Sequence, residues 1–189
     1  MRLLATAILS LNFSFLILTS AKAAEAPAVC PFCAIAAGKQ QQEGVVYHDD
    51  QVTAFLSLGA RNPGHILIVP NQHFENFMTL PDATMHHMTD VAKVLVEALK
   101  RTDLKCEGFM LQMSNGKPAG QSVFHAHLHI IPRYTGDSPT PPEATTPSER
   151  GATGQAESAP PPKRAGDPFS MADLAPIAAK IKAALATLK

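Results

Sequence analysis

The fold is decided by residues 121–133, which read Gln121-Ser122-Val123-Phe124-His125-Ala126-His127-Leu128-His129-Ile130-Ile131-Pro132-Arg133. Three histidines at a spacing of two alternate here with apolar residues. Successive side chains of a β-strand point to opposite faces, so a strand gathers the three imidazoles on one face. A helix would scatter them around its circumference. The pattern therefore predicts a strand over 123–131 with a histidine face and an apolar face.

A turn-rich loop precedes this strand. It reads Asn115-Gly116-Lys117-Pro118-Ala119-Gly120 and holds two glycines and a proline, which mark turns. Such a loop lets backbone N–H groups come close to an anion. Imidazoles beside a glycine loop that ends in Gln-Ser predict chemistry on a phosphate.

These residues resemble the histidine-triad (HIT) family of nucleotide hydrolases and transferases. The resemblance extends to Asn62-Pro63-Gly64-His65-Ile66-Leu67-Ile68-Val69-Pro70 and implies a HIT domain over 26–136. It implies an α+β fold, with an antiparallel sheet of about five strands and one main helix. It also implies a homodimer.

The residue pattern agrees with that fold. Apolar and β-branched runs predict strands over 45–48, 52–56, 64–69 and 108–114, in addition to the histidine strand. Apolar residues at helical spacing predict one long helix over 82–101, with Pro81 at its start. One helix on an antiparallel sheet is an α+β arrangement.

The N-terminus has the pattern of a secretory signal peptide over 1–23. Met1-Arg2 is followed by a mostly apolar run and an Ala-x-Ala site. The run is short and contains three polar residues, so we expect no stable membrane anchor. A periplasmic protein is therefore predicted. The formal net charge of zero indicates no basic patch for nucleic acid.

Composition changes sharply after the histidine strand. Residues 137–168 are rich in Pro, Ser, Thr, Gly, Ala and Glu, and such a segment buries too little apolar surface to fold. We expect a disordered linker there. An N-cap pattern at Ser170 and an apolar stripe predict an amphipathic helix over 169–189 that docks on the core or on a partner.

The cysteines of Cys30-Pro31-Phe32-Cys33 leave two alternatives open. An oxidising compartment favours a disulfide, whereas a Cys-x-x-Cys pair can also hold zinc. The resemblance implies the second alternative, a structural zinc whose other ligands are His73 and His125. No cofactor is expected to be needed for catalysis.

The resemblance also assigns roles at the phosphate. His127 is the expected nucleophile, His129 a second catalytic histidine, and His65 a residue that supports the nucleophile from the neighbouring strand. Ser122 and Gln121 are expected to stabilise charge on the phosphate. Asn115 and Gly120 are expected to bind the substrate.

One position departs from the family pattern. The family usually reads Phe-x-Asp at the end of the second strand, where the aspartate binds the ribose hydroxyls. Here Phe55-Leu56-Ser57 places a hydroxyl at that position, and a hydroxyl makes weaker hydrogen bonds than a carboxylate. The expected function is hydrolysis of a phosphoanhydride or phosphoramidate bond in a nucleotide, with altered nucleoside selectivity. The alternative is a non-catalytic nucleotide- or zinc-binding protein.

Overall fold

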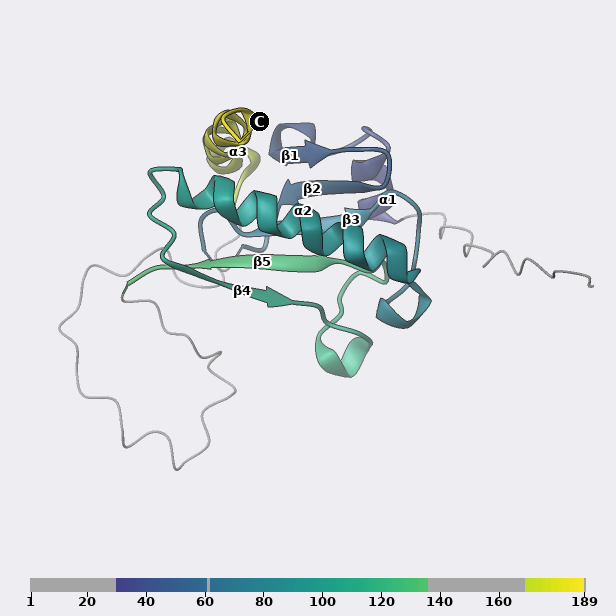
Figure 1. Cartoon of the computed structure of the whole chain (residues 1–189). Helices are drawn as coiled ribbons and strands as arrows, with labels where there is room; N and C mark the ends of the chain where they lie inside the picture. Colours follow the sequence, from purple (N-terminus) through teal and green to yellow (C-terminus); the bar gives the residue numbers. More distant parts are fainter. Residues whose placement is uncertain (1–29, 61, 136–168, 189) are drawn as a thin grey trace, which may run out of the picture.

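The computed structural model describes residues 30–60, 62–135 and 169–188. The predicted signal peptide (1–23) and linker (137–168) lie outside the described residues. The fold is one five-stranded antiparallel sheet in the order β1-β2-β3-β5-β4, with one long helix on one face and a C-terminal helix along the β1 edge (Figure 1). The expected α+β fold is confirmed.

The strands form on stretches that are rich in apolar and β-branched residues. The bounds are β1 Val45–His48, β2 Val52–Leu56, β3 Ile66–Pro70, β4 Gly108–Gln112 and β5 Leu128–Arg133. Every residue of β2 and β3 is buried, because both faces of these strands are covered. β1 and β2 have the predicted bounds, and β3 starts two residues later than predicted.

The histidine strand is shorter than predicted. β5 begins at Leu128, so His125 and His127 precede it and only His129 lies within it. The backbone N–H of Ala126 donates to the carbonyl of Phe74 at 2.6 Å, and that of His125 donates to Val123 at 2.9 Å. The prediction of a continuous strand over 123–131 is therefore wrong, because these contacts turn the backbone away from the sheet.

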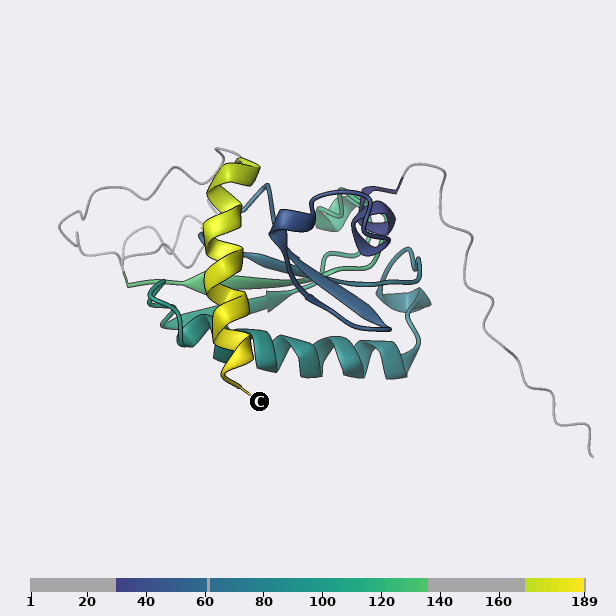
Figure 2. The same cartoon turned by 90° about the horizontal axis from the view of Figure 1, so that it is seen from above.

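The long helix α2 (Asp82–Lys100) packs on one face of the sheet. Its buried residues, among them Met88, Leu95 and Leu99, join Ile66, Ile68 and other strand residues in the main core. A smaller core of Ile35, Phe55, Leu67 and Val69 lies on the opposite face. The short helix α1 (Pro31–Ala36) covers that second face, as the view from above shows (Figure 2).

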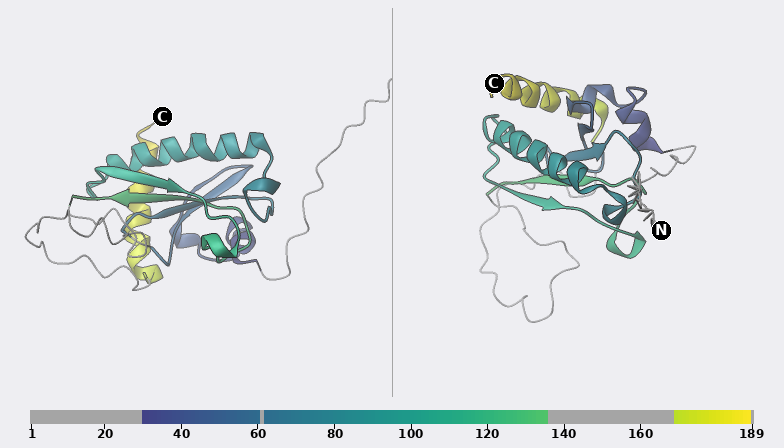
Figure 3. Two further views of the ribbon diagram at one scale, coloured as in Figure 1. Left: turned by 90° about the horizontal axis from the view of Figure 1, so that it is seen from below. Right: turned by 45° about the vertical axis from the view of Figure 1, so that its right-hand side comes forward.

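The C-terminal helix α3 spans Met171–Ala186. Ser170 accepts a hydrogen bond from the backbone of Asp173, whose side chain accepts one in return, so the predicted capping box is present. Leu174 and Ile181 are fully buried in the main core. The helix runs across the direction of α2, from the α1 side of the sheet to α2 (Figures 2 and 3). The predicted docking on the core is confirmed.

The remaining elements are three turns of 3-10 helix: η1 Gln42–Gly44, η2 Phe77–Thr79 and η3 Lys117–Ala119. η3 lies in the predicted glycine loop, between Gly116 and Gly120, whose φ angles are 82° and 83°. A left-handed backbone favours glycine at both positions. None of the described helices has the length and apolar character that crossing a membrane requires.

Asp49, in the turn between β1 and β2, is held by four hydrogen bonds. Burial alone would raise its pKa, but hydrogen bonds from the backbone N–H groups of Val52 and Gln51 and from the side chains of Tyr47 and His87 lower the pKa to about 2. His87 Nε2 lies 2.7 Å from Asp49 Oδ2 and joins α2 to the β1–β2 turn.

A carboxyl group whose pKa is lower in the folded state than in the unfolded state stabilises the fold at any pH above its unfolded-state pKa. The stabilisation is lost as the pH falls through the folded-state pKa. We therefore expect Asp49 to contribute about 1 kcal/mol at neutral pH, after allowance for its partial exposure, and to lose it between about pH 4 and pH 2. Urea unfolding at several pH values measures this. In Asp49→Asn, this decrease in the free energy of unfolding at acid pH should be absent. In Asp50→Asn, which changes the exposed neighbour, the decrease should remain. Equal acid sensitivity of both variants would contradict the prediction.

Candidate active site and metal centre

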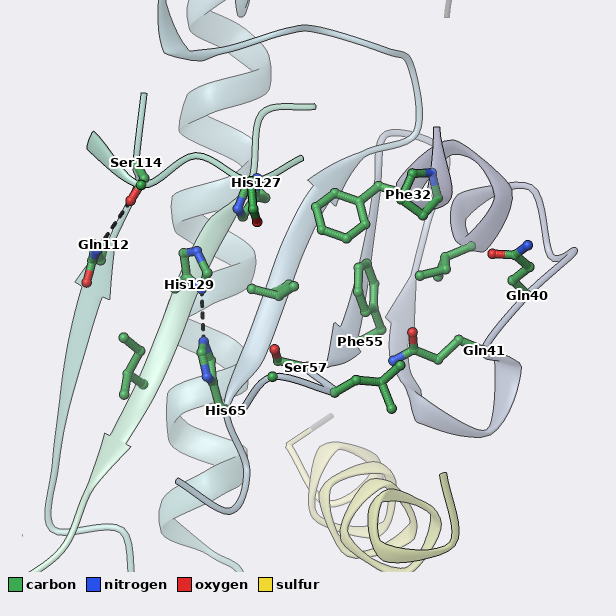
Figure 4. A pocket seen from close by; sticks show the side chains of 18 residues that line it. Phe32, Gln40, Gln41, Phe55, Ser57, His65, Gln112, Ser114, His127 and His129 are labelled. Carbon is green, nitrogen blue, oxygen red and sulfur yellow. Dashed lines mark hydrogen bonds between the residues drawn. The ribbon is translucent and has the colours of Figure 1, made fainter. Parts of the chain in front are cut away.

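A pocket of about 490 Å³ lies on the α1 side of the sheet. His127, His129 and His65 lie together on one side of it (Figure 4). Ser122 and Gly120 of the glycine loop also line the pocket. Phe32 lies near His127 and Ser57 near His65, whereas Gln41 lies farther from the histidines (Figure 4). The described residues that line the pocket include no aspartate, glutamate, lysine or arginine. The site therefore combines apolar and uncharged polar side chains with its histidines.

His127 is held in one tautomer. Its Nδ1 lies 2.7 Å from the backbone carbonyl oxygen of His125, and a carbonyl oxygen only accepts, so Nδ1 carries the proton. The Nε2 lone pair is then available on a side chain that is 5% exposed and lines the pocket. Burial lowers the pKa of His127, and the hydrogen bond to His125 partly offsets this. This arrangement presents a neutral imidazole nitrogen to a ligand.

His65 and His129 form a pair beside it. His65 Nε2 lies 2.9 Å from His129 Nδ1, and the His129 ring is 4.8 Å from the His127 ring. His65 thus contacts His129, whereas the sequence predicted support of His127 itself. Phe32 of α1, a residue that the sequence analysis missed, packs its edge against His127 with 5.1 Å between ring centroids.

The side-chain amides of Gln121 and Asn115, which the sequence predicted to bind the phosphate, lie outside the pocket lining. Gln121 is buried behind the glycine loop, where its Oε1 accepts from the N–H of Gly116 at 2.7 Å and its Nε2 donates to the carbonyls of Glu75 and Val123. Asn115 accepts from the N–H of Phe77 and donates to the carbonyl of Met113. Neither lines the pocket. Both amides hold the loop, and their expected direct contacts with substrate stay predictions.

Cys30, Cys33, His73 and His125 form a separate cluster, in which one ligand atom from each residue lies within 4.8 Å of the others. Both cysteines are free thiols, at the start of the short helix α1 that the sequence analysis did not predict. Three sulfur–Nδ1 distances, from Cys30 to His125 and from Cys33 to His73 and His125, are 3.4 Å. Tetrahedral zinc with two thiolates and two imidazoles needs sulfur–nitrogen separations of about 3.5 Å, so this donor set fits zinc.

The tautomer of His125 also suits a metal. Its Nε2 lies 3.0 Å from the carbonyl oxygen of Pro70 and donates to it, which leaves the Nδ1 lone pair facing the sulfurs. Burial lowers the pKa of His125 to about 4, so the ring is neutral. The same residue lends its backbone carbonyl to His127. The cluster and the pocket are therefore joined through three residues of backbone.

The glycine loop and the histidines match a known family. The model of the HIT domain matches residues 38–136. The chain belongs to the HIT family. Members of this family are generally nucleotide hydrolases and transferases.

Among relatives, an uncharacterized HIT-like protein of Methanocaldococcus jannaschii is 44% identical over 109 residues, which is 58% of this chain and 82% of the relative. "Protein hit" of Bacillus subtilis is 38% identical over 105 residues, covering 56% of this chain and 71% of the relative. A Zn-bound histidine triad family protein from Mycobacterium smegmatis superposes with a TM-score of 0.62 and 25% identity, over 84% of this chain and 94% of that one. A hypothetical histidine triad nucleotide-binding protein from Sulfolobus tokodaii superposes with a TM-score of 0.64 and 26% identity, over 85% of this chain and 94% of that one.

Proposed function

We propose that this HIT protein hydrolyses a phosphoanhydride or phosphoramidate bond of a nucleotide, with His127 as the nucleophile. The observation that carries the proposal is the His127 tautomer, which directs an unprotonated Nε2 into a pocket lined by the glycine loop. A neutral imidazole attacks phosphorus near pH 7 without a separate base, because the reference pKa of histidine is about 6.5.

The reaction takes two steps. The Nε2 lone pair forms a bond to phosphorus, and the bond from phosphorus to the leaving group breaks with its electron pair on the leaving oxygen or nitrogen, which takes a proton from water. Water then attacks phosphorus, the P–N bond breaks, and its electron pair returns to Nε2 while the water loses a proton to solvent. Dividing one displacement into two is ordinary covalent catalysis.

The remaining roles follow from position in the pocket. Ser122 is exposed at the mouth of the glycine loop and lines the pocket near His127, so its hydroxyl donates to a phosphate oxygen. Gly120 leaves open space where a Cβ would stand, so the phosphate approaches the backbone closely. His129, with His65 behind it, contacts the same phosphate. Donors placed at the equatorial oxygens stabilise the charge of the transition state.

In this proposal the metal has a structural role. Cys30, Cys33, His73 and His125 would hold zinc in a closed set of four protein ligands, which leaves no position for substrate. Zinc would join α1 to the segment that carries His125 and, two residues later, His127. The Zn-bound neighbour from Mycobacterium smegmatis supports this assignment.

One observation favours a second candidate function, a nucleotide-binding protein without catalysis. The described residues that line the pocket include Ser57 and no carboxylate, so the pocket has no charged clamp for the sugar of a substrate. Turnover decides between the two. We would incubate the protein with dinucleoside polyphosphates and nucleoside phosphoramidates, both ribose and 2′-deoxyribose forms. Nucleoside monophosphate release that needs His127 supports the hydrolase, and AMP binding without any turnover supports the binding protein.

We also propose a homodimer, formed through the β4 edge of the sheet. β4 is an edge strand, and Phe109 and Leu111 on it are 42% and 48% exposed. An unpaired edge with exposed apolar residues is a template for pairing with a second copy.

Leu111→Lys should therefore convert the dimer to a monomer, because the new charge would be desolvated at the edge. Light scattering after size-exclusion chromatography measures the mass. Met78→Lys is the matched control, since Met78 is 83% exposed and lies in η2, outside the β4 strand. A wild-type monomer, or a dimer that persists in Leu111→Lys, would overturn the β4 interface.

A further inference from the structure

The metal centre and the glycine loop rest on one segment of the chain, residues 70–77, which we call the linking segment. It runs from the end of β3 to the start of η2. The carbonyl oxygen of Pro70 accepts a hydrogen bond from His125 Nε2 at 3.0 Å, and His73 is itself a member of the metal cluster. The rings of His73 and His125 meet edge to face, with 5.0 Å between centroids. Both imidazole ligands of the metal are therefore set by this segment.

The linking segment also holds the glycine loop at two points. The backbone N–H of Phe77 donates to Asn115 Oδ1 at 2.7 Å, and Gln121 Nε2 donates to the backbone carbonyl of Glu75 at 2.6 Å. Both distances are at the short end of the range for N–H donors. Asn115 begins the loop and Gln121 directly follows it, so the linking segment fixes the loop at its start and at its end.

A third contact joins the linking segment to the expected nucleophile. The N–H of Ala126 donates to the carbonyl of Phe74 at 2.6 Å, and Phe74 directly follows the metal ligand His73. Ala126 stands between His125 and His127. A displacement of the linking segment at the metal would therefore act on the backbone of both histidines.

Residues 71–76 of the linking segment belong to no helix or strand. Segments without regular structure open more readily than core helices and strands. An ion bound to both His73 and His125 would remove part of this freedom before a ligand arrives. A ligand that requires the ordered glycine loop then loses less conformational entropy on binding, and this produces positive coupling between the two sites.

We infer that zinc in the cluster raises the affinity of the pocket for a phosphate ester, and that the linking segment carries this coupling. The metal is then a regulator of ligand binding in addition to its structural role. The inference rests on the proposed function for the placement of the phosphate at the glycine loop. Coupling between two binding sites is reciprocal, so a bound phosphate ester must raise the affinity for zinc by the same factor.

The test compares zinc-loaded full-length protein with protein that has been dialysed against EDTA, below the Tm of the zinc-free form. We expect the Kd for AMP, measured by calorimetry, to be about tenfold higher without zinc. Saturating AMP should lower the Kd for zinc, measured by competition with a chromophoric chelator, by the same factor. Without zinc, the backbone amides of residues 116–122 should exchange hydrogen freely, whereas the amides of α2 around Leu95 should remain protected.

Three variants separate coupling from direct contact. Asn115→Ala removes the acceptor for Phe77 and should lower the ratio of the two AMP Kd values from about tenfold to about threefold. Asn115→Asp retains an acceptor and should keep the ratio near tenfold. Ser122→Ala, which removes the hydroxyl that we place at the phosphate, should weaken AMP binding equally in both zinc states and leave the ratio unchanged.

Equal AMP Kd values in the two zinc states would overturn the coupling, as would a purified protein that binds no zinc. Loss of protection in α2 together with the loop would mean that zinc acts only by holding the whole fold together, and would also overturn it. A ratio unchanged in Asn115→Ala would overturn the role of the linking segment. Turnover with a zinc-independent AMP Kd rejects this inference alone, zinc-dependent AMP binding without turnover rejects the hydrolase alone, and no AMP binding by the wild type rejects both.

Discussion

His127→Ala should abolish the covalent nucleotidyl intermediate and lower kcat on the order of 10⁴-fold, because loss of a nucleophile removes the whole two-step route. The protein would be mixed with a dinucleoside polyphosphate, quenched rapidly in cold base, where a phosphoramidate survives better than in acid, and weighed by intact-mass spectrometry. The wild type should show an added mass equal to one nucleotidyl group. The size of that mass also identifies the group that is transferred.

His86→Ala is the matched control, because His86 is an exposed histidine on α2. It should form the adduct and turn substrate over as the wild type does. An adduct that survives in His127→Ala would move the nucleophile to another histidine. Turnover without any adduct in single-turnover quenching, yet dependent on His127, would point to a general-base role for this residue.

Removal of zinc from the cluster of Cys30, Cys33, His73 and His125 should strongly lower the stability of the fold. We expect purified protein to contain one zinc per chain, and Cys33→Ser or chelation to lower the free energy of unfolding by several kcal/mol. For a domain of this size the Tm should fall by about 10 °C or more. The reason is that zinc would join α1 to the segment around His125, which α1 otherwise contacts through the ring of Phe32. Elemental analysis and thermal unfolding measure the two quantities.

Cys106→Ser is the control for thiol chemistry. Cys106 is buried outside the cluster, and its Sγ donates to the carbonyl of Gly108 at 3.1 Å, a contact that a serine hydroxyl can keep. This variant should keep its zinc and lose about 1 kcal/mol at most. A protein with no bound zinc and a Cys30–Cys33 disulfide, found by mass before and after reduction, would instead restore the alternative that an oxidising compartment favours.

Sequence reasoning missed the contact between Asp49 and His87 and the left-handed backbone of Gln41, whose φ is 51°. His87 is 38 residues from Asp49 in the chain, and neither residue lies in a pattern that singles it out. Gln41 is a neutral residue in a polar stretch, and its left-handed backbone has no sequence signal, since residues with side chains rarely adopt it. Both features depend on contacts between segments that only the folded chain brings together.

The sequence by itself determined the elements that local chemistry controls. The apolar runs of β2 and β3, the helical spacing of α2 and the capping box of α3 each predicted an element that the structure contains. The residues of the Cys-x-x-Cys pair and the two partner histidines also stand together as the resemblance implied. These predictions succeed because periodicity and capping act over a few residues.

Only the tertiary structure decided how the histidines are used. The alternation over 123–129 predicted one strand with one histidine face, yet a strand needs a neighbour to accept its hydrogen bonds. β4 ends at Gln112, opposite His129, so the backbone before Leu128 bonds elsewhere. His125 then turns to the cysteines and His127 to the pocket. Long-range hydrogen bonds, which no local pattern encodes, separate one run of histidines into a metal centre and a candidate active site.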